Sequence, residues 1–238
     1  MINGKEILGI IPARAGSKGL RHKNMKLFCG KPLISWTVEA ALKSKYIDKV
    51  IVSTDSQDIA KIVNQYGELA PFIRPTFLST DTALSIDVIR HVCEYSKQQY
   101  SKEYDYIALL EPTSPLRETT DIDNAIFKLN TKNVSSVVGI SKTESQNPAF
   151  LVKKNAKDFI SWYDTSQSIG IRRQEVDPIF YLEGSIYVSD RNKLFEENSF
   201  YHDETIGYVM SKDKSLEIDD EFDFIMAEAL MRHRIENK

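Results

Sequence analysis

Short apolar runs alternate with amphipathic stretches along most of the chain. The apolar runs are typical of strands and lie at 7–11, 49–54, 105–110, 134–140, 184–188 and 205–210. The amphipathic stretches are typical of helices and lie at 32–44, 56–66, 84–99, 119–130 and 220–235. This alternation predicts βαβ units, and therefore an α/β fold with a mostly parallel sheet and helices on both of its faces.

One region breaks the alternation. Residues 141–183 contain Pro148, Pro178 and Trp162 among mixed polar residues, without a clear helical pattern. A long irregular stretch inside a compact α/β domain is usually functional. The chain has no internal repeat and no low-complexity linker, so we expect residues 1–238 to form a single domain.

The composition is that of an ordinary soluble protein, with 42% hydrophobic and 27% charged residues. A net charge of −3 gives no reason to expect nucleic acid or a membrane as a partner. Cys29 and Cys93 are the only cysteines and have no metal-binding or redox spacing, which favours reduced thiols. No apolar run approaches the roughly 20 residues of a membrane span, and the N-terminus lacks a signal-peptide pattern. We therefore expect a cytoplasmic location.

The stretch after the first apolar run has the composition of a phosphate-binding loop. Residues 11–24 read Ile-Pro-Ala-Arg-Ala-Gly-Ser-Lys-Gly-Leu-Arg-His-Lys-Asn, and Gly16, Ser17 and Gly19 permit a tight turn that exposes backbone N–H groups. Residues 12–31 hold six Lys or Arg and no acid. The loop matches neither the Walker A pattern nor the dinucleotide fingerprint. A solvated basic loop is the alternative, but such loops normally mix the two signs of charge.

Two acidic sites each have two interpretations. Asp55 ends a predicted strand at the edge where open α/β sheets bind ligands, although capping of the helix at 56–66 is the favoured interpretation. Glu217 and Asp219 lie two apart, so in a strand both carboxylates would face one side. Two such carboxylates repel each other unless a cation joins them, and Mg²⁺ prefers hard oxygen ligands. Alternatively, Asp219 caps the last helix.

The loop motif Pro-Ala-Arg-x-Gly-Ser-Lys-Gly-x-x-x-Lys-Asn resembles the signature of the acylneuraminate cytidylyltransferases, the CMP-sialic acid synthetases. The resemblance continues, in order, at 50–55, 74–75, 79–85, 112–117, 184–187 and 217–219. It therefore spans nearly the whole chain. It implies a Rossmann-like nucleotidyltransferase fold, in which 141–183 projects as a dimerisation arm and reaches over the active site of a partner subunit.

The resemblance also implies roles for individual residues. The triphosphate-binding positions are Arg14, Ser17, Lys18, Lys23 and Asn24. The cytidine contacts are Arg74 and Ser85, although Ser85 is an equally good N-cap for the helix at 84–99. The sugar contacts are Glu111, Arg173 on the arm and Tyr187, which is an equally plausible core tyrosine. The metal ligands are Glu217 and Asp219, and the catalytic residues are Arg14, Lys18, Lys23 and Asp219.

The implied reaction joins CTP to a nonulosonic (sialic-type) acid and releases pyrophosphate. Attack by the anomeric hydroxyl on the α-phosphorus would be direct, because the chain offers no convincing nucleophile, and Mg²⁺ or Mn²⁺ would assist. A homodimer is expected. The alternatives are a nucleotidyltransferase for another sugar acid or nucleotide, and a non-catalytic nucleotide-binding module of the same fold.

The chain departs from the family pattern at three places. Glu217 stands where the family has Asp, Glu111 stands where sialic-acid members have Gln, and Tyr-Leu-Glu-Gly at 181–184 replaces Arg-Pro-Asn-Gly. The last two changes predict a more acidic or less basic sugar pocket. N-acetylneuraminate is then not the best substrate, and a legionaminic, pseudaminic or amidino-bearing acid is preferred. The alternative is that Glu111 pairs with Arg117 or with an arginine of the arm.

Overall fold

The computed structural model describes residues 1–16, 19–143, 146–163 and 172–237. Its central sheet has six strands in the order β10-β6-β9-β5-β1-β4. Their bounds are β1 Ile7–Pro12, β4 Lys49–Ser53, β5 Tyr106–Leu109, β6 Ser136–Lys142, β9 Phe180–Asp190 and β10 Thr205–Val209. β9 runs antiparallel to β5 and β6, while β1 is parallel to β4 and β5, and β10 is parallel to β6. The predicted mostly parallel sheet is therefore confirmed.

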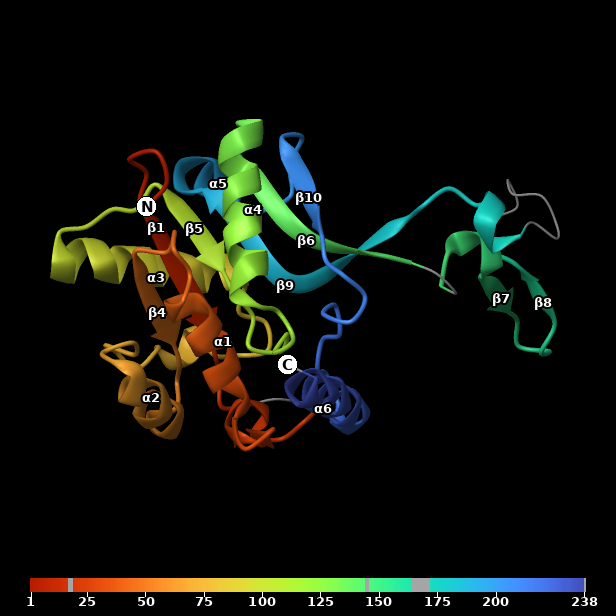
Figure 1. Ribbon diagram of the computed structural model, residues 1–238, viewed down its shortest axis with the longest axis horizontal. Helices are drawn as coiled ribbons and strands as arrows, with labels where there is room; N and C mark the ends of the chain where they lie inside the picture. Colours follow the sequence, from red (N-terminus) through yellow and green to blue (C-terminus); the bar gives the residue numbers. More distant parts are fainter. Residues whose placement is uncertain (17–18, 144–145, 164–171, 238) are drawn as a thin grey trace.

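Helices cover both faces of this sheet, as predicted (Figure 1). The helices are α1 Leu33–Leu42, α2 Gln57–Val63, α3 Ser85–Tyr100, α4 Thr119–Lys132, α5 Arg191–Glu197 and α6 Glu221–Glu236. Side chains of α1, α2 and α4 pack with Ile7 and Ile11 of β1 in one core cluster. Those of α3 and α5 pack with Leu8 and Ile10 in another. Alternate residues of β1 thus enter opposite cores, which explains why the whole strand is apolar.

A third core cluster attaches α6 to the rest of the domain. Phe28 is fully buried, and its ring meets Trp36 at 6.1 Å and Phe224 at 5.4 Å between centroids, edge to face. Leu116 and Ile218 complete the same cluster. The segments that precede α4 and α6 are therefore packed together by apolar contacts.

The sequence pattern did not predict several short elements. They are α5, β2 Leu27–Phe28, β3 Lys31–Pro32, β7 Val152–Lys154, β8 Ile160–Trp162, and the 3₁₀ turns Lys23–Met25, Asn64–Tyr66, Thr76–Leu78, Pro148–Phe150 and Arg173–Glu175. Each has too few residues for its apolar period to be recognisable; α5, for instance, buries only Leu194. None of the helices in the described part of the chain combines the length and hydrophobicity that crossing a lipid bilayer requires.

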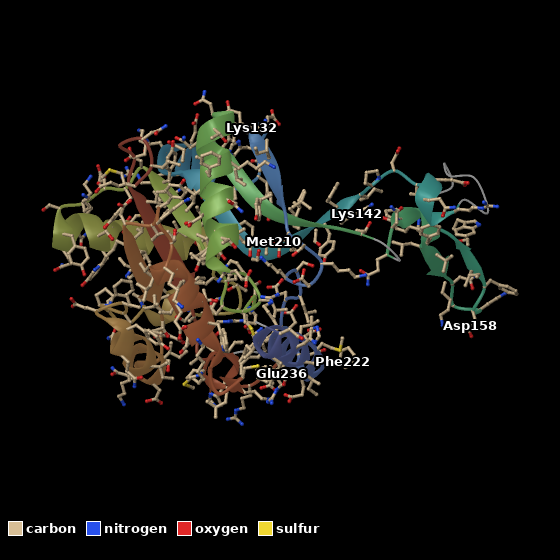
Figure 2. All side chains as sticks on the ribbon, viewed as in Figure 1. Lys132, Lys142, Asp158, Met210, Phe222 and Glu236 are labelled. Carbon is tan, nitrogen blue, oxygen red and sulfur yellow. The ribbon has the colours of Figure 1, made fainter. Side chains whose placement is uncertain are left out.

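The described residues of 141–183 form an arm that leaves the sheet. β6 and β9 continue side by side past the sheet edge, where Lys142 pairs with Phe180, and β7 and β8 form a hairpin beyond them. Figure 2 shows the side chains between Lys142 and Asp158 standing well away from the body of the molecule. The stretch is not simply irregular, because it contains this hairpin. Several of its described apolar side chains are exposed, among them Phe159 by 70% and Ile160 by 68%.

Candidate active site

The loop after β1 is held in shape by two side chains. The Ala15 N–H donates to Asp55 Oδ1 at 2.8 Å, and Asn24 Nδ2 donates to the Arg14 carbonyl at 3.1 Å. The prediction that Asp55 caps α2 is wrong, because Ser56 is the N-cap and its side chain accepts from the Ile59 N–H at 3.3 Å. Asp55 instead fixes the loop. Two predicted phosphate ligands, Ser17 and Lys18, lie outside the described residues.

Asn24 stabilises the conformation of this loop. Its side chain is only 8% exposed, and its Oδ1 is buried without a hydrogen-bond partner among the described residues. The predicted contact of Asn24 with phosphate therefore stays a prediction, whereas its role in holding the Arg14 carbonyl is visible. This hydrogen bond to the Arg14 carbonyl fixes the backbone that carries the Arg14 side chain.

Lys23 connects the loop to the acidic segment near the other end of the chain. It is 8% exposed, and its Nζ donates to the Ile218 carbonyl and lies 3.8 Å from Asp219 Oδ1. Burial lowers the pKa of Lys23, while the charges of Asp219, Glu217 and Glu111 oppose that shift. Three predicted site residues, Lys23, Glu217 and Asp219, are thus brought together.

The two segments also touch through their backbones. A Cβ atom built on Gly19 would lie 2.1 Å from the Asp219 carbonyl oxygen. No side chain fits into that space, so only glycine allows this close approach. At Gly16, by contrast, a Cβ atom would meet no atom of the described residues within 4 Å.

Glu217 is buried more deeply than Asp219. Thr113 Oγ1 donates to Glu217 Oε1 at 2.9 Å, and a Cβ atom on Gly184 (φ +76°) would lie 2.8 Å from Glu217 Oε2. Burial raises the pKa of Glu217, and the charge of Asp219 adds to that effect. The Asp219 side chain is 80% exposed. The site therefore has one largely buried carboxylate, Glu217, and one exposed carboxylate, Asp219.

The segment that carries these two acids is extended but is not a strand of the sheet. Ile218 is fully buried, and its N–H donates to the Thr113 carbonyl at 2.9 Å. The predicted strand is absent, and burial does not alternate as expected, because Leu216 and Glu217 are both half-buried. Capping by Asp219 is wrong, because Asp220 caps α6 and its Oδ1 accepts from the Asp223 N–H at 3.0 Å.

A cavity of about 230 Å³ lies beside the loop. Its lining includes Arg14, Arg74, Ser85 and Glu111, which the sequence assigned to nucleotide and sugar. Capping by Ser85 is wrong, since Ser85 is the first residue of α3 and the N-cap position is Leu84, without a side-chain cap. The Ser85 side chain is exposed on the cavity wall instead.

The two arginines of this cavity are already hydrogen-bonded. Arg14 Nη1 lies 2.6 Å from Asp81 Oδ1, and both side chains are partly exposed. Arg74 is 5% exposed, and its Nε donates to Ser79 Oγ at 3.1 Å. Asp81 and Ser79 belong to the motif at 79–85 that carried the resemblance, but nothing in the sequence indicated their pairing with arginine.

Glu111 follows β5 and lies at the wall of this cavity. Burial raises the pKa of Glu111 to about 7; the charge of Glu217 adds to the rise, and Arg117 opposes it. Arg117 does not pair with the Glu111 carboxylate. It donates to the Glu111 carbonyl at 3.2 Å, to the Ser185 carbonyl, and to Thr37 Oγ1 at 2.8 Å. Within the described part of the chain, the Glu111 carboxylate has no ion pair.

Tyr187, another expected sugar-site residue, is not among the described residues that line this cavity. Tyr187 is half-buried beside Leu109, and its ring packs 5.3 Å from that of Phe200 and 6.2 Å from that of Tyr201. The core interpretation of Tyr187 therefore describes it better. Arg173 has its backbone in a 3₁₀ turn on the arm, and its side chain lies outside the described part of the structure.

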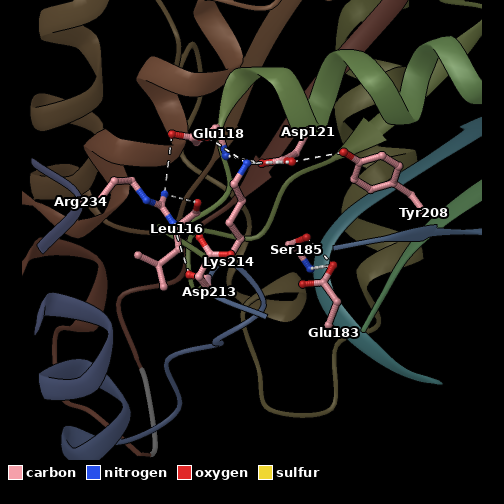
Figure 3. A network of polar contacts seen from close by, with 9 residues as sticks. All are labelled: Leu116, Glu118, Asp121, Glu183, Ser185, Tyr208, Asp213, Lys214 and Arg234. Atoms are coloured by element: carbon pink, nitrogen blue, oxygen red, sulfur yellow. Dashed lines mark hydrogen bonds and ion pairs between the residues drawn. The ribbon is translucent and has the colours of Figure 1, made fainter. Parts of the chain in front are cut away.

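Glu183 does not line this cavity, so it adds no acid to the cavity wall. It is 2% exposed, its Oε1 accepts from Ser185 Oγ and from the Ser185 N–H at 3.3 Å (Figure 3), and it is absent from the cavity lining. Its carboxylate occupies the space beside Gly139, where a Cβ atom would lie 1.9 Å from Oε1. Glu183 is a buried acid of the sheet interior.

Comparison with known proteins agrees with this geometry. The model of the family described as "Cytidylyltransferase" matches residues 8–232. The chain belongs to the cytidylyltransferase family. This cytidylyltransferase is 35% identical over 235 residues to an N-acylneuraminate cytidylyltransferase of Escherichia coli, covering 98% of this chain but 54% of that one. It is 38% identical over 230 residues to a CMP-N,N'-diacetyllegionaminic acid synthase of Legionella pneumophila, covering 94% of this chain and 96% of that one.

The cytidylyltransferase thus spans about half the length of the Escherichia coli relative and nearly all of the Legionella relative. Among solved structures, a CMP:2-keto-3-deoxy-manno-octonic acid synthetase complexed with CTP superposes with a TM-score of 0.67 at 18% identity, covering 96% of this chain and 99% of that one. That similarity confirms the Rossmann-like nucleotidyltransferase fold.

Proposed function

We propose that this cytidylyltransferase transfers CMP from CTP to a nonulosonic acid and releases pyrophosphate. The observation that carries the proposal is the junction of the glycine loop with the acidic segment, where Lys23 meets the Ile218 carbonyl and Asp219. Phosphate-binding cations and hard oxygen ligands thereby share one edge of the sheet. Two relatives whose names specify nonulosonic acids, from Escherichia coli and Legionella, support this substrate class.

The nucleotide would lie in the cavity beside the loop. Arg74 and Ser85 supply donors for the carbonyl and ring-nitrogen acceptors of cytosine. Arg14 would exchange part of its contact with Asp81 for phosphate oxygens, and Lys23 would lie near the phosphates from the opposite side. Ser17 and Lys18 complete the predicted triphosphate site.

The carboxylates fit a magnesium or manganese ion that is shared with the nucleotide. Glu217 and Asp219 are hard oxygen donors; burial is the main cause of the raised pKa of Glu217, and the charge of Asp219 adds to it. The described residues include no group of three or more His, Cys, Asp or Glu placed to hold a metal alone. Two carboxylates plus substrate phosphates form a usual Mg²⁺ environment. When bound, the ion would supply positive charge at the α-phosphate.

The reaction proceeds by direct displacement. The anomeric oxygen forms a bond to the α-phosphorus, the bond to the bridging oxygen of pyrophosphate breaks, and the hydroxyl proton leaves to solvent or to a nearby base. Lys23 and Arg14 would offset charge on the departing pyrophosphate. Neither cysteine is a ready nucleophile, because burial raises the pKa of Cys29 and brings that of Cys93 to about 12.

The substitution Asp219→Asn tests both the reaction and the role of the acids. It should lower kcat/KM for pyrophosphate release by roughly 30- to 1,000-fold, about 2–4 kcal/mol of transition-state stabilisation, because one metal-binding charge is lost. Asp58→Asn, at an exposed position on α2, is the matched control and should leave the rate unchanged. A loss below tenfold, or wild-type turnover that persists undiminished in excess chelator, contradicts the assignment.

Glu111 determines which nonulosonic acid is preferred. Above its pKa of about 7, Glu111 only accepts hydrogen bonds, whereas Gln also donates, and Glu111 lines the cavity without an ion pair to another described residue. The ratio of kcat/KM for legionaminic- or pseudaminic-type acids to that for N-acetylneuraminate should exceed one and should fall at least fivefold in Glu111→Gln. Glu94→Gln, on the exposed side of α3, should leave the ratio unchanged. An unchanged ratio in Glu111→Gln, or a wild-type ratio below one, refutes this role.

We further propose a homodimer in which each arm reaches the partner's active site. The exposed Phe159 and Ile160 provide apolar surface that a second copy would bury, and Arg173 would approach the sugar or nucleotide from the partner's arm. An Arg173→Ala variant mixed with a Lys18→Ala variant should regain activity, because each mixed dimer has one intact site. Sedimentation should show a dimer. A fully active monomer excludes the arrangement.

A further inference from the structure

The segment that carries Glu217 and Asp219 belongs to no regular element. Between β10 and α6, residues 211–219 have few backbone hydrogen bonds, chiefly a turn from the Lys214 N–H to the Ser211 carbonyl at 2.9 Å and the bond from Ile218 to Thr113. A backbone with so few bonds does not fix itself in place. The position of both acids therefore depends on side chains that anchor the segment.

Lys214 anchors the middle of the segment to the start of α4. Its side chain is 17% exposed, and its Nζ lies 2.9 Å from Glu118 Oε2 and 3.0 Å from Asp121 Oδ2 (Figure 3). Burial alone would lower the pKa of Lys214, but its hydrogen bonds and charge interactions with Glu118 and Asp121 raise it above the ordinary value. Lys214 is therefore held as a cation.

The acceptors of Lys214 are themselves fixed. Asp121 is 5% exposed, its Oδ2 accepts from the Glu118 N–H at 2.8 Å, and Tyr208 of β10 donates to its Oδ1 at 3.2 Å. The next residue, Ile122, is fully buried in the core under α4. Lys214 is thus tied to the buried start of α4.

Arg234 of α6 joins the same network from the opposite side. Its Nη1 donates to the Leu116 carbonyl at 2.8 Å, and its Nη2 donates to the Asp213 carbonyl and to Asp213 Oδ2, each at 3.2 Å. One guanidinium therefore joins α6, the loop that contains Thr113, and the segment that contains Glu217. A guanidinium has five N–H donors in fixed directions, so it can donate to several acceptors at once.

We propose that Lys214 and Arg234 are positioning residues for the Glu217–Asp219 carboxylate pair. They hold the segment against the loop at 111–117, so that Glu217 meets Thr113 and both acids stand beside Lys23 without a strand to support them. This inference rests on the proposed function, because it gives the acid pair its role in metal and phosphate binding. Residues that orient metal ligands typically change metal affinity 10- to 100-fold when they are removed.

The test compares Lys214→Met and Arg234→Met with Arg232→Met. Arg232 is the matched control, since it lies on the same helix, is 62% exposed and has its ion pair with Glu228. The first readout is hydrogen exchange of the Ile218 amide in metal-free protein. The second is the dissociation constant of Mn²⁺ in the presence of CTP without sugar acid, and the third is that of CTP in excess chelator.

Both test variants should exchange the Ile218 amide at least tenfold faster and bind Mn²⁺ about tenfold more weakly, with CTP affinity in chelator within twofold of the wild type. Arg232→Met should match the wild type in all three readouts. Lys214→Arg, which keeps the charge, should retain wild-type exchange and Mn²⁺ affinity. If Lys214→Met does not fold, Lys214→Gln takes its place with the same expected losses.

Wild-type exchange or wild-type Mn²⁺ affinity in Arg234→Met overturns the inference, as does a wild type that binds no Mn²⁺ with CTP. The proposed function fails separately, if the wild type releases no pyrophosphate with any nonulosonic acid. The exchange and Mn²⁺ measurements do not use that reaction, so the two failures are distinguishable.

Discussion

The site depends on one contact, the docking of the glycine loop onto the backbone of the acidic segment. Gly19 lies against the Asp219 carbonyl, and Lys23 donates to the Ile218 carbonyl across a separation of 195 residues along the chain. The contact joins main-chain atoms at Gly19 and a buried ammonium group at Lys23, so it sets the distance between cations and carboxylates more firmly than a surface ion pair would. Only a residue without Cβ permits the approach at Gly19.

The sheet explains why these distant segments can meet. β1, β4 and β5 are mutually parallel, so the loop at 12–24, Asp55 and Glu111 all follow strands at the same edge. Open α/β sheets bind ligands at this edge because loops, rather than packed side chains, line it. The acidic segment follows β10 to the same edge but does not pair with any strand of the sheet. The ion pairs of Lys214 with Glu118 and Asp121 hold it in place of strand hydrogen bonds.

Much of this arrangement could be predicted from the sequence, and the parts that could not have physical reasons. Long apolar and amphipathic patterns located the main strands and helices, and the loop motif located Arg14 and Lys23. Capping roles for Asp55, Ser85 and Asp219 were plausible but wrong, because a neighbour one residue away occupies each N-cap position. Helix starts are uncertain by about that much in any pattern.

The sequence also did not predict which polar side chains would be buried. Glu183 lies in the interior and not in the pocket, because Gly139 on the neighbouring strand leaves room for its carboxylate. Such a pairing depends on strand register, which local sequence does not encode. For the same reason, no motif indicated that Thr113 would donate to Glu217 or that Arg117 would bond to carbonyls instead of to Glu111.

The free energy of unfolding of Gly19→Ala, set beside that of Gly16→Ala, tests the docking contact most directly. Both variants add one methyl group to the same loop, but only the one at position 19 would collide with the Asp219 carbonyl, at 2.1 Å. The account predicts that Gly19→Ala loses about 1–3 kcal/mol of stability, while Gly16→Ala changes it by less than about 0.5 kcal/mol. Equal effects at the two positions would contradict the account.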